Sequence, residues 1–209
     1  MSEETVQVTK KYYDYISVGN RTKQVVYFVE QHDKLVHFEL FLKEYKTTKA
    51  VVIVKNKKTA DTLGSYLKEK EINAVVIHGN HRVSQHKDAQ DAFNANETDI
   101  LITTSKIYET LELDNIKTII NYDLPFDATD YFKTLRAVDE VGESISFVNI
   151  DDEVILDTIE LMMKYEIPKE ELDAFTHTAL PKMQKNIKKK PRHKKSKTRV
   201  KTTAEDSSN

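Results

Sequence analysis

The sequence has no cysteine among its 209 residues. Disulfide bonds, thiolate catalysis and cysteine-ligated metal sites are therefore excluded, and a cytoplasmic location is expected, or a nuclear one if the source is eukaryotic. No apolar run approaches the ~18–20 residues of a membrane span. The first six residues also lack the basic and then apolar layout of a signal peptide.

Glycine is almost as scarce as cysteine. The four glycines are Gly19, Gly64, Gly79 and Gly142. A phosphate-binding loop needs closely spaced glycines whose amides converge on the phosphates, followed by a Lys and a Ser or Thr. None of the four glycines fits that pattern, so no nucleotide cofactor is expected.

Charge is unevenly distributed along the chain, although the formal net charge is only -2. Residues 185–209 hold ten of the 32 Lys and Arg and two of the 34 Asp and Glu, a net charge of +8. Residues 1–184 keep 22 bases and 32 acids, a net charge of -10. An acidic globule with a basic tail points to RNA or another polyanion as the partner of the tail.

Short apolar runs alternate with amphipathic segments. This alternation predicts an α/β sandwich with a mostly parallel sheet. The expected strands are residues 24–29, 50–54, 74–78, 100–103, 118–122 and 144–148. The expected helices are residues 33–45, 57–70, 83–94, 107–113 (a short turn), 128–137, one opening at 151–153, and a short one beginning at Pro168.

Four regions are expected on this basis. Residues 1–20 form a lead-in or linker with little regular structure, and the polar character continues to residue 24. Residues 21–166 form the folded domain, and residues 167–184 a short helical extension. Residues 185–209 lose nearly all apolar content, so we expect a disordered basic tail.

The order of these segments resembles the second, C-terminal RecA-like lobe of DEAD-box RNA helicases. The resemblance covers about residues 15–165 and rests on residues 15–19, 24–27, 33–34, 52–61, 77–80, Phe93, 100–104, 119–125, Tyr131 and 145–148. It implies a RecA-like fold. An Asp-Glu-Ala-Asp box, which holds magnesium in the family, is missing from the sequence.

The motifs that carry the family's chemistry are altered here. Motif VI supplies arginine fingers, but its place at residues 131–142 is about three residues short and keeps Arg136 alone. In motif V the family's Arg-Gly pair reads Glu109-Thr110, and Glu112 stands at the aspartate that meets the nucleotide ribose. We therefore expect no catalytic residue and no bound nucleotide, with Glu112 and Arg136 as vestigial positions.

Further departures affect the helix after residues 78–80. The family's glutamine and phosphate-binding arginine fall on Val83 and His86, while Arg82, one position earlier, could reach a phosphate. His78, His81 and His86 have spacings that suit no shared helical face, and no carboxylate or cysteine completes a ligand set. No metal site is expected.

Several residues at expected strand ends could still contact RNA sugar and phosphate groups, as this lobe does in the family. They are Asn56, Lys57, Gly79, Arg82 and Thr104. The tail is the stronger candidate, with steep salt dependence and little sequence preference. Its candidate residues are Lys188, Lys189, Lys190, Arg192, Lys194, Lys195, Lys197 and Arg199.

The sequence thus favours a non-catalytic protein that binds RNA or ribonucleoprotein through a degenerate helicase lobe and its basic tail. Two alternatives remain open. The chain could be the C-terminal half of a split ATP-dependent RNA helicase that completes an ATPase with a separate first lobe. It could also be a protein–protein adaptor, with Glu109 and Glu112 facing a basic partner.

Overall fold

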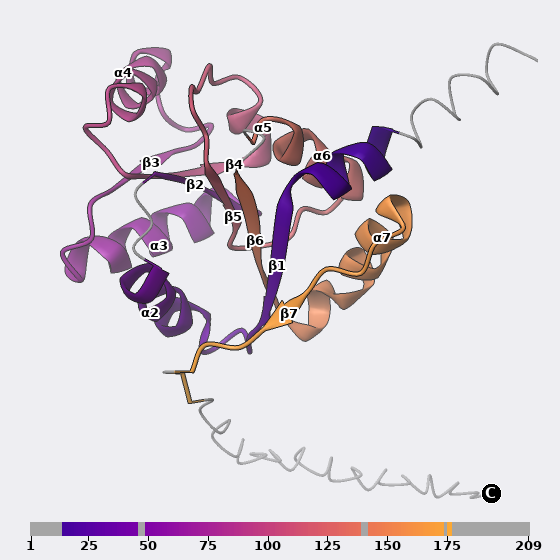
Figure 1. The fold of residues 1–209 in the computed structure, drawn as a ribbon. Helices are drawn as coiled ribbons and strands as arrows, with labels where there is room; N and C mark the ends of the chain where they lie inside the picture. The colour runs from indigo at the N-terminus through magenta and orange to yellow at the C-terminus, as the bar shows by residue number, and fades with distance from the viewer. Residues whose placement is uncertain (1–13, 46–48, 139–141, 174, 177–209) are drawn as a thin grey trace, which may run out of the picture. The chain divides into compact units, whose positions relative to one another are not determined.

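In the computed structural model, which describes residues 14–45, 49–138, 142–173 and 175–176, seven strands form one sheet (Figure 1). The sheet order is β3-β4-β2-β5-β6-β1-β7, and all neighbouring strands are parallel. The predicted α/β, RecA-like fold is confirmed. The strands are β1 (Lys23–Phe28), β2 (Ala50–Val54), β3 (Ala74–Ile77), β4 (Ile100–Thr104), β5 (Thr118–Asn121), β6 (Glu143–Val148) and β7 (Lys169–Glu170).

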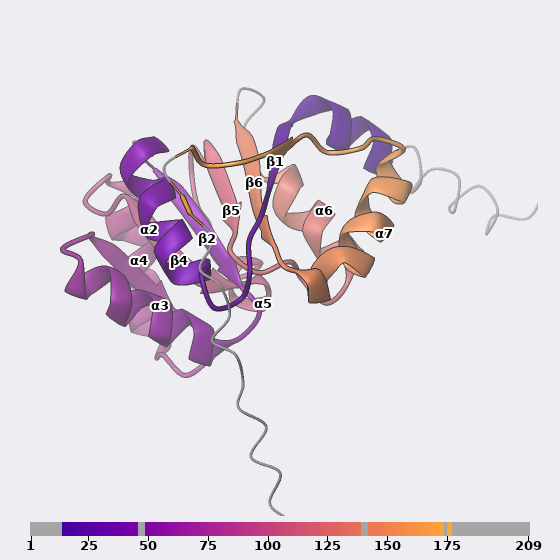
Figure 2. The same cartoon turned by 90° about the horizontal axis from the view of Figure 1, so that it is seen from below.

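Helices cover both faces of the sheet, which makes three layers (Figure 2). Side chains alternate between the faces along each strand: on β2, Val52 packs with helices α2 (Lys34–Tyr45) and α3 (Lys57–Glu69), whereas Val51 and Ile53 pack on the other face. The helices are α2 (Lys34–Tyr45), α3 (Lys57–Glu69), α4 (Val83–Asn94), α5 (Ser105–Tyr108), α6 (Ala128–Arg136) and α7 (Glu153–Met163), with a 3₁₀ turn η1 (Ile150–Asp152) before α7.

The sequence explains most of these bounds. Strand β2 is buried at all five positions, as expected for a central parallel strand with a continuous apolar run. Helix α3 begins where the Asn56 side chain accepts a hydrogen bond from Thr59 N, and Ala60, Leu63 and Leu67 form its buried stripe. The predicted bounds of β2 and α4 match the structure at both ends.

The N-terminal lead-in was predicted to have little regular structure, and this is wrong for residues 14–21, which are helical. Tyr15 and Val18 are buried against α6 and α7, and the Tyr15 ring lies 4.5 Å from the Phe132 ring. Burial of one face stabilises a helix that the polar sequence does not predict.

Two further predictions need correction. Residues following Pro168 form strand β7 rather than a helix, because Val26 and Tyr27 of β1 pair with Lys169 and Glu170. The turn predicted at residues 107–113 is helix α5 instead, which ends at Tyr108. The chain then runs back along α4, where Asn94 and Gln90 bind the Glu112 backbone.

The predicted basic tail, residues 185–209, lies outside the described residues, as does half of the predicted extension at residues 167–184. None of the helices in the described ranges combines the length and apolar character of a membrane span.

Candidate functional site at the carboxyl edge of the sheet

All seven strands end on one side of the sheet, which we call the carboxyl edge. In an open parallel sheet this is the side where ligands bind. The register brings the predicted residues together, because Val54 pairs with Thr104 and Thr103 pairs with Ile77. Asn56 and Lys57 after β2, Gly79 after β3 and Thr104 at the end of β4 therefore follow three adjacent strands.

The loops after β2 and β3 are in direct contact. The Lys57 ammonium donates to Asn80 Oδ1 at 3.2 Å, and both residues are exposed. Asn56 is committed to a structural role, since its Oδ1 accepts from the Thr59 backbone at 3.0 Å. Lys57 is thus the more available of the two predicted contacts.

Gly79 is exposed and has open space above it. A Cβ built on Gly79 would meet a single atom, Ile107 Cδ1, at 4.0 Å, and the backbone φ is not positive. Neither packing nor backbone geometry therefore requires glycine here. A ligand that approaches the backbone closely would require it.

Thr104 and Arg82 mark the starts of two helices. Thr104 is half-buried and makes no side-chain cap to α5, so its hydroxyl is not used in capping. Arg82 is exposed at the start of α4, where its backbone N–H donates to Gln85 Oε1 at 2.9 Å. Both side chains remain accessible at the same edge as Gly79.

Charge is divided sharply along the carboxyl edge. The segments after β2, β3 and β4 (residues 55–58, 78–82 and 104–107) contain bases and no acid. The segments after β5 and β6 (residues 123–127 and 149–153) contain acids and no base. We call these the basic half and the acidic half. The bases are Lys55, Lys57, Lys58, Arg82 and Lys106, and the acids are Asp123, Asp127, Asp151, Asp152 and Glu153.

Three ion pairs hold the boundary between the halves together, and sequence reasoning missed all of them. The buried Lys34 ammonium lies 2.9 Å from Asp123 Oδ1 and 4.0 Å from Asp152 Oδ2. The Lys55 ammonium lies 2.6 Å from Asp152 Oδ1, and the Lys55 N–H donates to Asp123 Oδ2 at 3.1 Å. Polar residues placed directly after apolar strands were the available signal for this network.

The three histidines after β3 also gather, contrary to the expectation from their spacing. The His78 and His81 rings lie 4.2 Å apart, and His86 Nε2 lies 3.3 Å from the His78 carbonyl oxygen. His78 is buried, and its Nε2 lies 2.8 Å from the Asp61 carboxylate. Within the described residues, no group of three His, Asp or Glu side chains could hold a metal ion.

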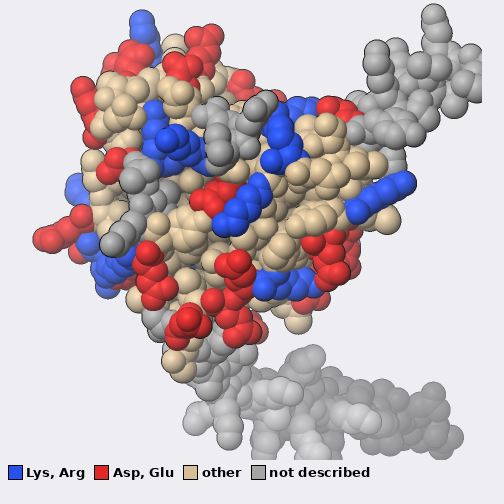
Figure 3. Space-filling model, in the orientation of Figure 1, with Lys and Arg blue, Asp and Glu red and all other residues tan. Residues whose placement is uncertain are grey.

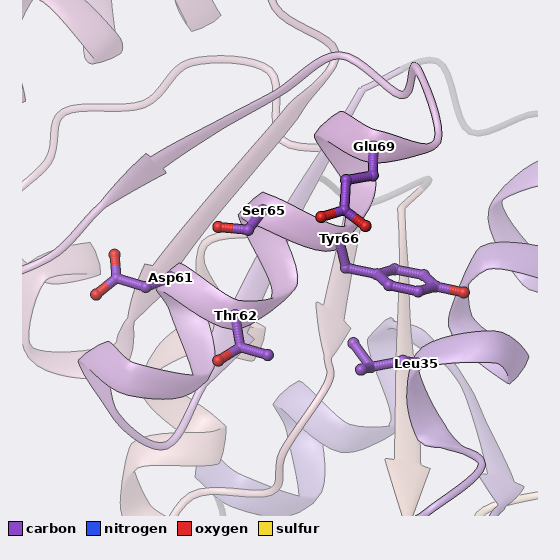
Figure 4. Close-up of a pocket in the computed structure, with 6 residues that line it drawn as sticks. All are labelled: Leu35, Asp61, Thr62, Ser65, Tyr66 and Glu69. Carbon is purple, nitrogen blue, oxygen red and sulfur yellow. The ribbon is translucent and has the colours of Figure 1, made fainter.

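Asp61 also lines a hollow between α2 and α3 of about 430 Å³ (Figure 4). Tyr66 extends from α3 toward α2, and its hydroxyl donates to Glu39 Oε2 at 2.6 Å. Burial and this hydrogen bond raise the pKa of Tyr66 to about 12. Two carboxylates, Asp61 and Glu69, line the hollow, so it is not suited to a phosphate.

Glu109 of the altered motif V and the vestigial Arg136 form ion pairs away from the strand ends, whereas the vestigial Glu112 is exposed and is bound through its backbone. Glu109 pairs with Lys133 of α6 at 3.0 Å, and the hydrogen bonds from Lys133 to Asp130 and then Glu109 raise the lysine pKa. Arg136 pairs with Asp14 and lies 5.8 Å from the Tyr15 ring. Helix α6 starts at the carboxyl edge and runs nine residues away from it, which places Arg136 about 12 Å from that edge.

A sequence model described as the helicase conserved C-terminal domain matches residues 30–136, about half of the chain. The chain belongs to this family. It is 32% identical over 140 residues to the ATP-dependent RNA helicase vasa of Drosophila melanogaster. The matched region covers 64% of this chain and 21% of vasa. The chain therefore spans about a fifth of the length of this curated relative, and its sequence corresponds to a DEAD-box C-terminal lobe.

Solved DEAD-box structures share the fold. A DEAD box protein from Methanococcus jannaschii superposes with a TM-score of 0.68 at 24% identity, over 81% of this chain and 49% of that one. The E. coli protein SrmB, solved with regulator of ribonuclease activity A, superposes with a TM-score of 0.68 at 17% identity, over 76% of this chain and 98% of that one. S. cerevisiae Dbp5 bound to RNA and ADP BeF3 superposes with a TM-score of 0.68 at 22% identity, over 73% of this chain and 42% of that one.

Proposed function

We propose that this helicase C-terminal lobe binds RNA without hydrolysing ATP. One observation carries the proposal: residues of the basic half are exposed at the carboxyl edge, whereas Glu109 and Arg136 of the altered motifs are held in ion pairs. Lys57, Gly79 and Arg82 are exposed at adjacent strand ends. Glu109 and Arg136 instead form ion pairs with Lys133 and Asp14.

The basic tail supplies most of the affinity in this proposal. The domain itself carries a net charge of -10 over residues 1–184, and one face of it shows acids and bases interspersed (Figure 3). Phosphate binding at the basic half therefore requires additional positive charge from another segment of the chain. Residues 185–201 contain ten Lys and Arg, enough for strong counterion release on RNA.

The test is a filter-binding or mobility-shift titration with single-stranded RNA at several salt concentrations. The full chain is compared with residues 1–184. We expect the full chain to bind more tightly and to have the steeper salt slope. Equal affinity of the two proteins would remove the tail from the proposal, and no binding by either would overturn it.

A split helicase is the second candidate, and the relationship to vasa favours it. Vasa is an ATP-dependent RNA helicase, and this chain matches only 21% of its length. Adding a separate first-lobe protein and RNA, then measuring ATP turnover, separates the two functions. Turnover above that of the first lobe alone would support the split helicase. A cytoplasmic location belongs to either proposal, because the chain has no cysteine.

A further inference from the structure

Phe126 stands out at the carboxyl edge because its side chain is 81% exposed. Its neighbours Leu124 and Ala128 are buried, so the ring is held out of an adjacent core. A phenylalanine left in water forgoes about 2 kcal/mol of burial free energy. Phe126 belongs to the acidic half, but β5, which it follows, is the direct neighbour of β2, where the basic half begins. Single-stranded nucleic-acid binding proteins stack bases on exposed aromatic side chains near a basic surface.

The backbone on both sides of Phe126 is fixed. Pro125 precedes it and is buried. Asp127 follows and caps helix α6, with Oδ1 accepting from the Thr129 N–H at 2.8 Å. That hydrogen bond holds the carboxylate at the helix start and also lowers the pKa of Asp127. Because the backbone next to Phe126 is already fixed, binding would order only the side chain and would cost little conformational entropy.

A line of contacts joins Phe126 to the basic half. The Lys55 ammonium lies 5.1 Å from the centre of the Phe126 ring and 2.6 Å from Asp152 Oδ1. Lys55 is two residues before Lys57, which contacts Asn80 next to Gly79. The candidate phosphate contacts Lys57 and Gly79 are therefore connected to the Phe126 ring through Lys55.

We propose that Phe126 stacks on a base of single-stranded RNA whose backbone lies along the basic half. This inference rests on the proposed RNA-binding function and adds a contact that residues 56, 57, 79, 82 and 104 do not supply. Those residues offer backbone amides, a hydroxyl and charges, which suit sugar and phosphate. Stacking is tolerant of sequence, so the site selects unpaired bases rather than a particular one.

Phe28 provides a matched control within the same edge. It ends β1, is 37% exposed, and its ring lies 5.7 Å from the Lys169 ammonium. Strand β6 separates β1 from β5, and the basic half lies beyond β5. Phe28 thus also has a lysine ammonium beside its ring, but strands β5 and β6 separate it from the basic half.

The test uses the full chain with an oligoadenylate of about 12 nucleotides that contains one 2-aminopurine. Anisotropy reports affinity, and 2-aminopurine fluorescence reports stacking at saturation. We expect Phe126→Ala to weaken binding by about 5- to 100-fold. It should also abolish the fluorescence quenching and leave the salt slope unchanged. Phe126→Trp should retain quenching, and Phe28→Ala should match the wild type.

The outcomes separate this inference from the function on which it rests. Wild-type RNA binding with unchanged affinity and quenching in Phe126→Ala would overturn the stacking contact and leave RNA binding intact. Equal losses for the oligoadenylate and for an abasic strand of the same length would also overturn it. If Phe126→Ala reduced only the stimulation of a separate first lobe, the ring would be a protein contact. No RNA binding by the wild type would overturn both.

Discussion

The Lys34 ammonium lies 2.9 Å from Asp123 Oδ1, although the Lys34 side chain is 0% exposed. Lys34 opens helix α2, whereas Asp123 follows β5, so the pair fixes a helix to the carboxyl edge. Burying a charge is costly unless it is paired, and removal of one partner leaves the other uncompensated.

We therefore predict that Lys34→Met and Asp123→Asn each lower the free energy of unfolding by about 3–5 kcal/mol. The double variant should lose less than the sum, because it leaves no unpaired charge of the pair. Urea denaturation followed by circular dichroism measures all three. The exposed pair Lys169–Glu166 is the control, and its disruption should cost less than about 1 kcal/mol. Additive losses in the double variant would show that the buried charges are not coupled.

The ionisation of Glu39 should make the free energy of unfolding depend on pH in the acidic range. Hydrogen bonds, first from Lys43 and then from Tyr66, lower the Glu39 pKa from 4.5 to about 2. A lowered folded-state pKa stabilises the fold above the unfolded value, and the contribution is lost as pH falls from about 4.5 toward 2. Glu39→Gln should be less stable than the wild type by about 1–3 kcal/mol at pH 7. The two melting temperatures should converge near pH 2, and a gap that is independent of pH would contradict the assignment.

Apolar patterning predicted the order of strands and helices well but not the charge network at the carboxyl edge. The run at residues 50–54 and the stripe of Ala60, Leu63 and Leu67 are local features, so they fix β2 and α3 without tertiary information. Strand β7 has two residues and exists through its pairing with β1, which no local pattern encodes.

The boundary network shows the same limit more strongly. Lys34, Lys55, Asp123 and Asp152 come from four segments, and each alone looks like a surface charge. Only the sheet order, which places β2 between β4 and β5, brings them into contact. Phe126 was missed for a related reason: its neighbours Leu124 and Ala128 are buried, and the sequence does not reveal that the ring turns outward.

Gly64 should resist substitution for steric reasons. A Cβ on Gly64 would lie 2.2 Å from Val76 Cγ2, where α3 packs on β3. Alanine favours a helix by about 1 kcal/mol over glycine, but overpacking of this kind costs about 1–3 kcal/mol. We expect Gly64→Ala to lower the melting temperature, as measured by calorimetry. A melting temperature above that of the wild type would mean that Val76 moves aside freely.

Gly79 should behave in the opposite way, with a functional rather than a structural effect. Its added Cβ would meet nothing closer than 4.0 Å, so Gly79→Ala and Gly79→Val should change the unfolding free energy by less than about 0.5 kcal/mol. If a phosphate approaches this backbone, the larger side chain stands in its way and should weaken RNA binding by about 10-fold, more for Val than for Ala. Anisotropy titrations of both variants at low salt measure the effect. Wild-type affinity in Gly79→Val would place the RNA away from the loop after β3 and leave the tail as the main contact.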